Sequence, residues 1–327
     1  DPEMPRKYAT GREWEHMPCL RCQCIKIDRN GRFSGPCSVN PMAGFTKEYP
    51  ELRVNPAPVR KRVGVVGGGP AGIQAVKTLR ERGHDVTLYE RGSELGGQVI
   101  RAAAPEFKTD LRQYLEYLRA FAEHSGAKIL TDTEATPETL AGENFDALVV
   151  AVGAKHFVPK VPGTGAPNVS WAAEASAENV PENAAVVIVG AGAIGIEAAV
   201  ELGRAGRRVT VIELAPTHGL GSDMSPLGGG DDLLGWLREL NIPVIYNAKL
   251  TEVRPGEVVY ADTVSGGTVT LAADRVLLAA GMVPLTDEAQ SFRSAAPNTE
   301  VYLVGDCFST GDIRDATRTA FDIARQI

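Results

Sequence analysis

Residues 63–72 read VGVVGGGPAG, and residues 186–195 read VVIVGAGAIG. In each stretch an apolar run typical of a buried strand leads directly into a glycine-rich GxGxxG turn. A helix-length segment and a second apolar run follow, ending in Glu90 and Glu213, each 23 positions after the first glycine of its turn. Strand, glycine turn, helix, strand and terminal glutamate make up a dinucleotide-binding unit. Because the whole arrangement occurs twice, it predicts an α/β fold with two Rossmann-like domains.

The three glycines of each turn have separate tasks. The first permits the tight turn, the second lets the backbone approach a pyrophosphate, and the third lets the helix pack close to the sheet. The pyrophosphate lies at the helix N-terminus, where free N–H groups and the helix dipole favour an anion. One such glycine alone is usually an ordinary turn, but two complete units favour nucleotide binding. The predicted binding residues are Gly67, Gly69, Pro70, Ala71, Gly72, Glu90 and Arg91 in the first unit, and Gly190, Gly192, Ala193, Ile194, Gly195 and Glu213 in the second.

The second unit also indicates which nicotinamide nucleotide binds. Glu213 is placed to accept a hydrogen bond from a ribose 2′-hydroxyl and would repel a 2′-phosphate, which needs a nearby arginine. Residues 214–218 contain no Arg or Lys, whereas Arg207 and Arg208 precede the strand, and we expect them at its far end. The sequence therefore predicts NADH in preference to NADPH.

Size and charge limit the possible functions. The 327 residues, 43% hydrophobic with 35 glycines, have room for two domains and a small appendage. A net charge of −7 argues against nucleic-acid binding. No apolar stretch reaches the roughly 18 residues of a membrane helix, and the first residues lack the apolar core of a signal peptide. We expect a cytoplasmic protein without membrane contact and, because the chain does not begin with Met, a piece or processed form of a longer one.

Four of the five cysteines, Cys19, Cys22, Cys24 and Cys37, lie within 19 positions. An odd count in a chain with cytosolic cofactor motifs argues against a disulfide scaffold. Four thiolates suit either zinc or an iron–sulfur cluster. One CxxC pair with a crowded third cysteine and a distant fourth favours [4Fe–4S], with unligated cysteines as the plain alternative. For the remote Cys307 we expect a small buried hydrophobe.

The order of the predicted elements indicates the domains. Residues 1–60 show little periodicity and end in a proline-rich linker. The strand over 301–306 has no helix of the second unit to follow, so we expect the chain to return to the first domain. The predicted domains are a cysteine segment at 1–60, a first domain at 61–180 plus 283–327, and a second domain at 181–282 inserted in it. Further predicted strands are 128–130, 147–151, 243–246, 258–261, 268–271 and 276–280, and further helices are 110–122 and 315–327.

Taken together, the motifs resemble the C-terminal half of an iron–sulfur flavoprotein family. That family includes 2,4-dienoyl-CoA reductase, trimethylamine dehydrogenase and bacterial bile-acid oxidoreductases. The matches occur in the family's order and span nearly the whole chain. They are residues 19–22 (CLRC), 37–41 (CSVNP), 67–72, 95–98 (LGGQ), 190–195 with Glu197, and 304–307 (VGDC).

The resemblance implies a set of cofactors and an electron path. In the family a TIM barrel carries FMN and the substrate site, a [4Fe–4S] cluster links it to an FAD domain, and an NAD(P)H domain is inserted in the latter. The barrel is absent here, although residues 1–5 resemble its last turn, so FMN is expected only if a barrel is supplied upstream or as a separate subunit. The resemblance implies that Cys19, Cys22, Cys24 and Cys37 hold the cluster and that Gly97, Gln98, Gly305 and Asp306 join the FAD site. Gly153 and Gly281, which follow corresponding strands of the two units, are further predicted cofactor-binding residues.

Two departures and two alternatives accompany this interpretation. Only Gln23 separates Cys22 from Cys24, where the family has two or three residues, and the redox-active cysteine pair of disulfide reductases is missing. The leading hypothesis is an NADH-oxidising FAD module that passes electrons to the cluster. The alternatives are a structural module that binds ADP, and a stand-alone electron-transfer subunit. Hydride transfer needs mainly orientation, so no catalytic acid or base is named, and Glu197 could face the flavin or be an ordinary surface residue.

Overall fold

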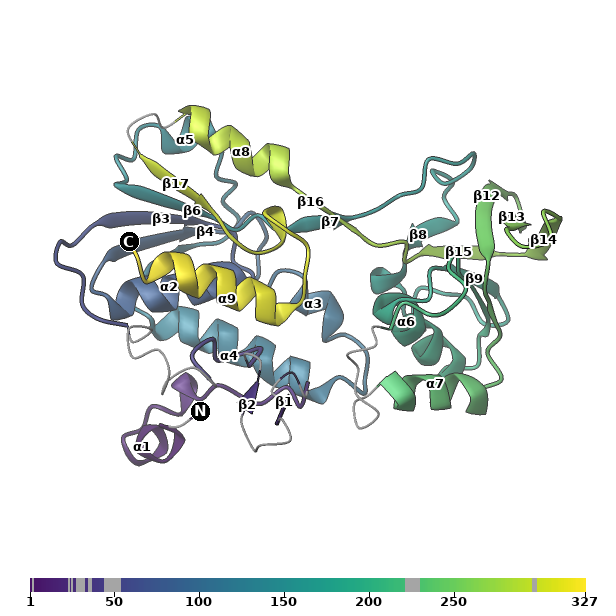
Figure 1. Ribbon diagram of the computed structural model, residues 1–327, viewed down its shortest axis with the longest axis horizontal. Helices are drawn as coiled ribbons and strands as arrows, with labels where there is room; N and C mark the ends of the chain where they lie inside the picture. Colours follow the sequence, from purple (N-terminus) through teal and green to yellow (C-terminus); the bar gives the residue numbers. More distant parts are fainter. Residues whose placement is uncertain are drawn as a thin grey trace. The chain divides into compact units, whose positions relative to one another are not determined.

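The computed structural model describes residues 1, 3–22, 24, 26–27, 33–34, 37–43, 54–220, 230–295 and 299–327. The chain forms two units, each with its own parallel sheet (Figure 1). Unit 1 consists of residues 1–104, 108–155 and 284–327, and unit 2 of residues 105–107 and 156–283. The predicted α/β class with two Rossmann-like domains is confirmed. Among the described helices, none is both long enough and apolar enough to cross a membrane.

Unit 1 is built on a five-stranded parallel sheet. Two of its inner strands are apolar and buried over residues 63–66 and 147–150, as expected where helices cover both faces. The last strand of the chain lies beside a strand from its first half, with Val301 opposite Leu148, so residues after 299 complete the first sheet. The strand order is β17 (Glu300–Leu303), β6 (Ala147–Val150), β3 (Arg62–Val66), β4 (Asp85–Tyr89) and β5 (Lys128–Leu130).

Helices cover both faces of this sheet (Figure 1). On one face, α2 (Pro70–Glu81) and α9 (Ile313–Ala324) share a core with the strands that includes Val63, Leu79 and Ala320. On the other, α5 (Pro137–Leu140) and α8 (Thr286–Ala295) enclose a second core around Phe145 and Phe292. The short α3 (Val99–Ala102) leads to α4 (Thr109–His124), which packs beside α2.

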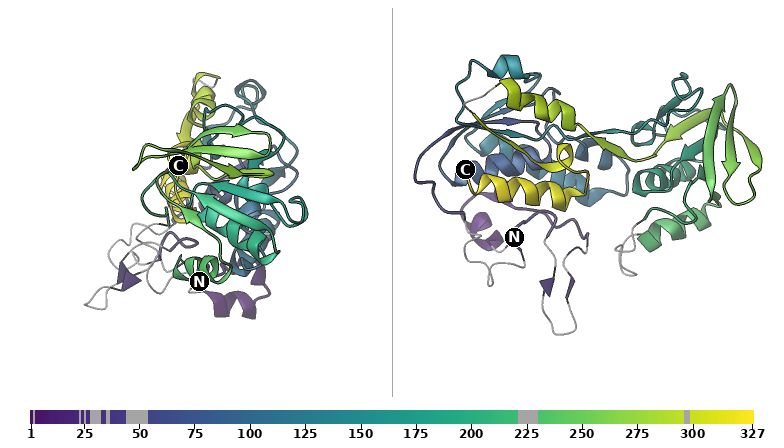
Figure 2. Two further views of the ribbon diagram at one scale, coloured as in Figure 1. Left: turned by 90° about the vertical axis from the view of Figure 1, so that its right-hand side faces the viewer. Right: turned by 45° about the horizontal axis from the view of Figure 1, so that its top comes forward.

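The described part of the N-terminal segment packs against α4, on the side of the sheet that carries α2 and α9 (Figure 2). Trp14 of η1 (Glu13–Glu15) stacks on His124 with ring centroids 4.9 Å apart and also contacts Phe121. The buried carboxylate of Asp1 pairs with Lys7 of α1 (Met4–Ala9) at 2.8 Å. Two short paired strands, β1 (Lys26–Ile27) and β2 (Phe33–Ser34), follow. Aromatic packing thus holds the segment against α4, and the buried ion pair fixes its first residues.

Unit 2 repeats the plan of unit 1. Helices α6 (Ala193–Arg204) and α7 (Gly230–Glu239) pack on one face of its parallel sheet, and a three-stranded antiparallel sheet packs on the other. The parallel order is β11 (Val244–Ile245), β10 (Arg208–Ile212), β9 (Ala185–Val189), β15 (Arg275–Leu278) and β8 (Val169–Trp171), with η3 (Ala172–Glu174) after β8. The antiparallel order is β12 (Ala248–Arg254), β13 (Glu257–Asp262) and β14 (Thr268–Ala272).

The antiparallel hairpin predicted around Gly266 is confirmed as β13 and β14. The sequence patterns missed β12, the third strand of this antiparallel sheet, and the helices α7 and α8. The chain passes between the two units on either side of residues 105–107, within β7 (Ala154–His156) and within β16 (Met282–Pro284). A short turn, η4 (Gly305–Cys307), follows β17. The predicted assignment of FAD to the first domain and NAD(P)H to the second stays a prediction.

Candidate functional site

The first glycine of each turn has a backbone that only glycine adopts readily. Gly67 has φ +103° and Gly190 has φ +114°, both in the left-handed region. A Cβ atom on Gly67 would collide with the carbonyl oxygen of Ala151, and one on Gly190 would collide with that of Ala279. The two turns therefore share one geometry, in which the turn passes directly over the neighbouring strand end.

The other two glycines shape the start of each helix. A Cβ atom on Gly72 or Gly195 would overlap the carbonyl oxygen of the first glycine, so only hydrogen fits there. Gly69 and Gly192 are the extended N-caps of α2 and α6, and neither helix has a side-chain cap. Around Gly192 there is open space. An open turn at an uncapped helix N-terminus leaves N–H groups available to an anion, so these residues fit the pyrophosphate of a dinucleotide.

Glu90 and Glu213 are hydrogen-bonded to the turns in the same way. The two oxygens of Glu90 accept the N–H groups of Gly68 and Gly92, each at 2.7 Å. Those of Glu213 accept the N–H groups of Ala191 at 2.6 Å and Ala215 at 2.8 Å. A carboxylate oxygen has two lone pairs, so each glutamate can still accept a ribose hydroxyl. The sequence predicted the position of both glutamates but not these bonds to the backbone.

Arg207 and Arg208, which precede Glu213 in the sequence, are hydrogen-bonded to backbone carbonyl groups away from the second glycine turn. The guanidinium of Arg207 donates to the carbonyl groups of Ala177 and Ala205, both at 2.6 Å, and to that of Val180. Arg208 is the first residue of β10 and donates to the carbonyl of Asn183 at 2.8 Å. Glu213 follows the last residue of β10, so the two arginines are held at the opposite end of that strand.

Residues 95–98 lie on the first glycine turn. The N–H of Gly96 donates to the carbonyl of Gly68 at 2.9 Å, and a Cβ atom on Gly97 would come 3.0 Å from Gly69. The side-chain nitrogen of Gln98 donates to the carbonyl of Ala154 at 3.1 Å, whereas its buried side-chain oxygen has no partner among the described residues. An unpaired buried oxygen needs a donor, and a bound cofactor can supply one.

The turn at Gly305 lies beside the start of α2. A Cβ atom on Gly305 would come 2.8 Å from that of Ala71. Asp306 accepts the N–H of Gly311 at 3.2 Å, and burial raises the pKa of its carboxyl above the ordinary value. The predicted FAD residues at 67–72, 97–98 and 305–306 thus gather around the N-terminus of α2. Of the others, Arg91 is exposed, and Gly153 and Gly281 have left-handed backbones near the points where the chain changes unit.

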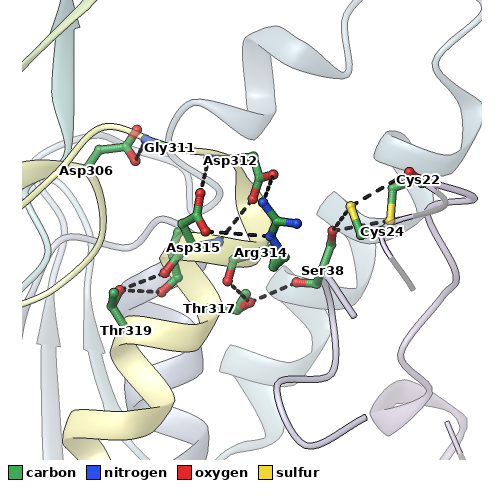
Figure 3. A network of polar contacts seen from close by, with 11 residues as sticks. Cys22, Cys24, Ser38, Asp306, Gly311, Asp312, Arg314, Asp315, Thr317 and Thr319 are labelled. Carbon is green, nitrogen blue, oxygen red and sulfur yellow. Dashed lines mark hydrogen bonds and ion pairs between the residues drawn. The ribbon is translucent and has the colours of Figure 1, made fainter. Parts of the chain in front are cut away.

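Two of the four clustered cysteines meet at one serine (Figure 3). The Cys22 sulfur lies 3.3 Å from the Ser38 hydroxyl oxygen, and the Ser38 hydroxyl donates to the Cys24 sulfur at 3.5 Å. Cys19 is exposed, and Cys37 is half-buried and directly precedes Ser38. Within the described ranges, no three His, Cys, Asp or Glu residues are arranged to hold a metal ion. The four thiols suit an iron–sulfur cluster chemically, and the ligand set stays a prediction.

Cys307 is fully buried, as expected. Its thiol donates to the carbonyl groups of Val150 at 3.3 Å and Val304 at 3.2 Å. Burial raises the pKa of this thiol, which disfavours the reactive thiolate. Cys307 therefore packs as a small apolar side chain.

Comparisons with known proteins agree with this architecture. Residues 61–321 match the family described as pyridine nucleotide-disulphide oxidoreductase. The NADH oxidase of Thermoanaerobacter brockii is 32% identical over 100% of this chain and 50% of its own length. The cinnamate reductase of Clostridium sporogenes is 28% identical over 100% of this chain and 48% of its own. A solved 2-naphthoyl-CoA reductase, at 29% identity, superposes with a TM-score of 0.88 over 100% of this chain and 49% of that structure.

The chain spans about half the length of the curated relatives it matches. The part of them that it matches is their C-terminal half, as the resemblance implied. The chain belongs to the pyridine nucleotide-disulphide oxidoreductase family, as an FAD- and NAD(P)H-dependent oxidoreductase module of multi-domain flavoenzyme reductases.

Proposed function

We propose that this chain takes electrons from NADH into FAD and passes them through a [4Fe–4S] cluster to an acceptor domain outside the chain. Unit 2 binds NADH, unit 1 binds FAD, and Cys19, Cys22, Cys24 and Cys37 hold the cluster. The acceptor is an FMN-bearing TIM barrel, joined upstream or present as a separate subunit. The observation that supports this most is the pair of matching turns, each with a glutamate bound to its backbone.

The residues of unit 1 have distinct tasks in this proposal. When bound, FAD supplies the chemistry of accepting a hydride and releasing single electrons. The N-terminus of α2 holds the pyrophosphate, and Glu90 accepts a ribose hydroxyl. Gln98 offers its unpaired oxygen to a donor on the cofactor, and the turn at Gly305 closes the site beside Ala71.

Unit 2 selects the nicotinamide nucleotide by charge. Glu213 accepts the free 2′-hydroxyl of NADH and repels the 2′-phosphate of NADPH. Arg207 and Arg208 donate to backbone carbonyl groups at the far end of β10, which supports the absence of a phosphate contact from either side chain. The proposal therefore favours NADH.

Three measurements on the purified chain, prepared without oxygen, test this function. Denaturation should release FAD, NADH should bleach the flavin absorbance, and the protein should contain iron and acid-labile sulfide in equal amounts. A colourless protein that releases only ADP would instead identify a structural nucleotide-binding module. Zinc without sulfide would show that the metal is wrongly assigned.

A further inference from the structure

The hydroxyl of Ser38 lies between two sulfur atoms. It is within 3.3 Å of the Cys22 sulfur and 3.5 Å of the Cys24 sulfur, and Ser38 is only 4% exposed (Figure 3). While both thiols carry protons, either atom of the Cys22–Ser38 pair can be the donor. A metal-bound thiolate has no proton, so the single hydroxyl proton of Ser38 is then the one that these two sulfurs can share.

Helix α9 holds Ser38 in this position. The buried hydroxyl of Thr317 donates to the Ser38 carbonyl at 2.9 Å, and Arg318 donates to the carbonyl of Pro41 at 2.7 Å. These bonds join residues 279 and 277 positions apart. The serine is therefore fixed by a helix in the core of unit 1 and not by its own loop alone.

The charged side chains next to the two sulfurs offset one another, so no single cation dominates the electrostatics there. Arg314 on the same helix interacts electrostatically with Cys24. It also pairs with Asp312 at 3.2 Å and Asp315 at 3.6 Å, so two carboxylates offset its charge. The neutral hydroxyl of Ser38, which lies within hydrogen-bond distance of both sulfurs, is the more specific influence on them.

We propose that Ser38 sets the reduction potential of the thiolate-bound cluster, and that Thr317 is the positioning residue that holds Ser38 in place. This inference rests on the cluster of the proposed function. Hydrogen bonds to ligand sulfurs withdraw negative charge from them, so they favour the reduced state and raise the potential. The serine thereby makes the cluster a better acceptor of electrons.

The test is a redox titration of the cluster, followed by electron paramagnetic resonance in the full chain. Ser38→Ala should retain iron and sulfide and disfavour the reduced cluster about tenfold, which lowers a one-electron midpoint potential by about 59 mV. Ser38→Thr keeps a hydroxyl and should restore the potential. Thr317→Val should lower the potential by a smaller amount, whereas its matched control Thr317→Ser should leave it unchanged.

The outcomes separate this inference from the proposed function. A wild-type chain without iron and sulfide would refute both. If the wild type contains iron and sulfide and Ser38→Ala has the same midpoint potential, only the role of Ser38 is refuted. If Ser38→Ala loses its iron, the Thr317 pair decides the question: equal potentials in Thr317→Val and Thr317→Ser overturn the inference, and a lower potential in Thr317→Val supports it.

Discussion

Glu90 and Glu213 are equivalent residues in two different units. Each directly follows a strand, β4 for Glu90 and β10 for Glu213, and accepts one backbone N–H from the glycine turn and one from the residue two positions after itself. Their surroundings are so alike that each serves as the control for the other. Substituting one should affect only the nucleotide of its own unit.

The first prediction concerns FAD retention. Glu90→Ala removes a charged acceptor for the ribose and frees the N–H of Gly68, so FAD binding should weaken by about 1.5–3 kcal/mol. Dialysis followed by flavin absorbance measures the loss. Glu213→Ala should retain FAD like the wild type. Equal retention in Glu90→Ala and wild type would show that Glu90 does not hold the ribose.

The second prediction concerns the choice of nicotinamide nucleotide. Wild-type flavin should be reduced by NADH with a kcat/KM at least about tenfold above that for NADPH, which corresponds to about 1.4 kcal/mol. Glu213→Ala combined with Ala215→Arg should narrow or reverse this ratio, because it exchanges a negative for a positive charge. Stopped-flow reduction with both nucleotides measures it, and Glu90→Ala loaded with FAD is the control. Equal kcat/KM values for NADH and NADPH in the wild type would mean that a cation reaches the 2′-phosphate of NADPH.

At the scale of elements, the nucleotide-binding strands and helices could be predicted, and several others could not. Their apolar runs and fixed glycine spacing give a local pattern that agrees with the structure. This holds for β3, α2 and β4 in unit 1 and for β9, α6 and β10 in unit 2. α8 was missed because few of its side chains are apolar; Ala289 and Phe292 supply its buried contacts. β12 was missed because a bulge breaks its alternation: Thr251 and Glu252 both lie between the buried Leu250 and Val253.

The contacts of Ser38 could not be predicted for a different reason. Its partner Thr317 is 279 positions away, and neither residue belongs to a motif that joins them. Such a contact follows from the return of the chain to the first sheet, which brings α9 beside the cysteine segment. A hydrogen bond of this kind becomes visible only once the tertiary structure is known.

The third prediction concerns the cysteine segment as an element. Cys37→Ser should abolish iron binding, because a four-thiolate cluster loses one ligand. Cys307→Ser is the matched control: the hydroxyl can still donate to Val150 and Val304, and the site lies in the core of unit 1. Iron and sulfide analysis after anaerobic reconstitution measures both variants. Normal iron content in Cys37→Ser would exclude this residue as a ligand.

At the scale of the whole molecule, unit 2 has a core of its own. Its two apolar clusters lie on opposite faces of its parallel sheet, and only residues 105–107 come from outside the continuous stretch 156–283. Phe107 contributes an aromatic contact to Trp236, with ring centroids 5.4 Å apart. Unit 1, in contrast, needs three separate stretches of chain.

The fourth prediction follows from this difference. Residues 156–283 produced alone should fold cooperatively and bind NADH, with some loss of stability from the missing Phe107. Circular dichroism and tryptophan fluorescence measure folding and binding, and the same fragment with Glu213→Ala should fold but bind NADH less tightly. A fragment without a cooperative melting transition would show that unit 2 depends on unit 1.

The discontinuity of unit 1 also has a consequence for the order of events during synthesis. Domains generally fold as units while the chain emerges from the ribosome, and unit 2 is complete at Val283. β17 and α9 emerge later, so the first sheet lacks its edge strand and Ser38 lacks Thr317 until residues 300–324 have followed unit 2. The first half of unit 1 is therefore translated before unit 2 but completed after it, so its sheet and the contacts of Ser38 form only after unit 2 has emerged.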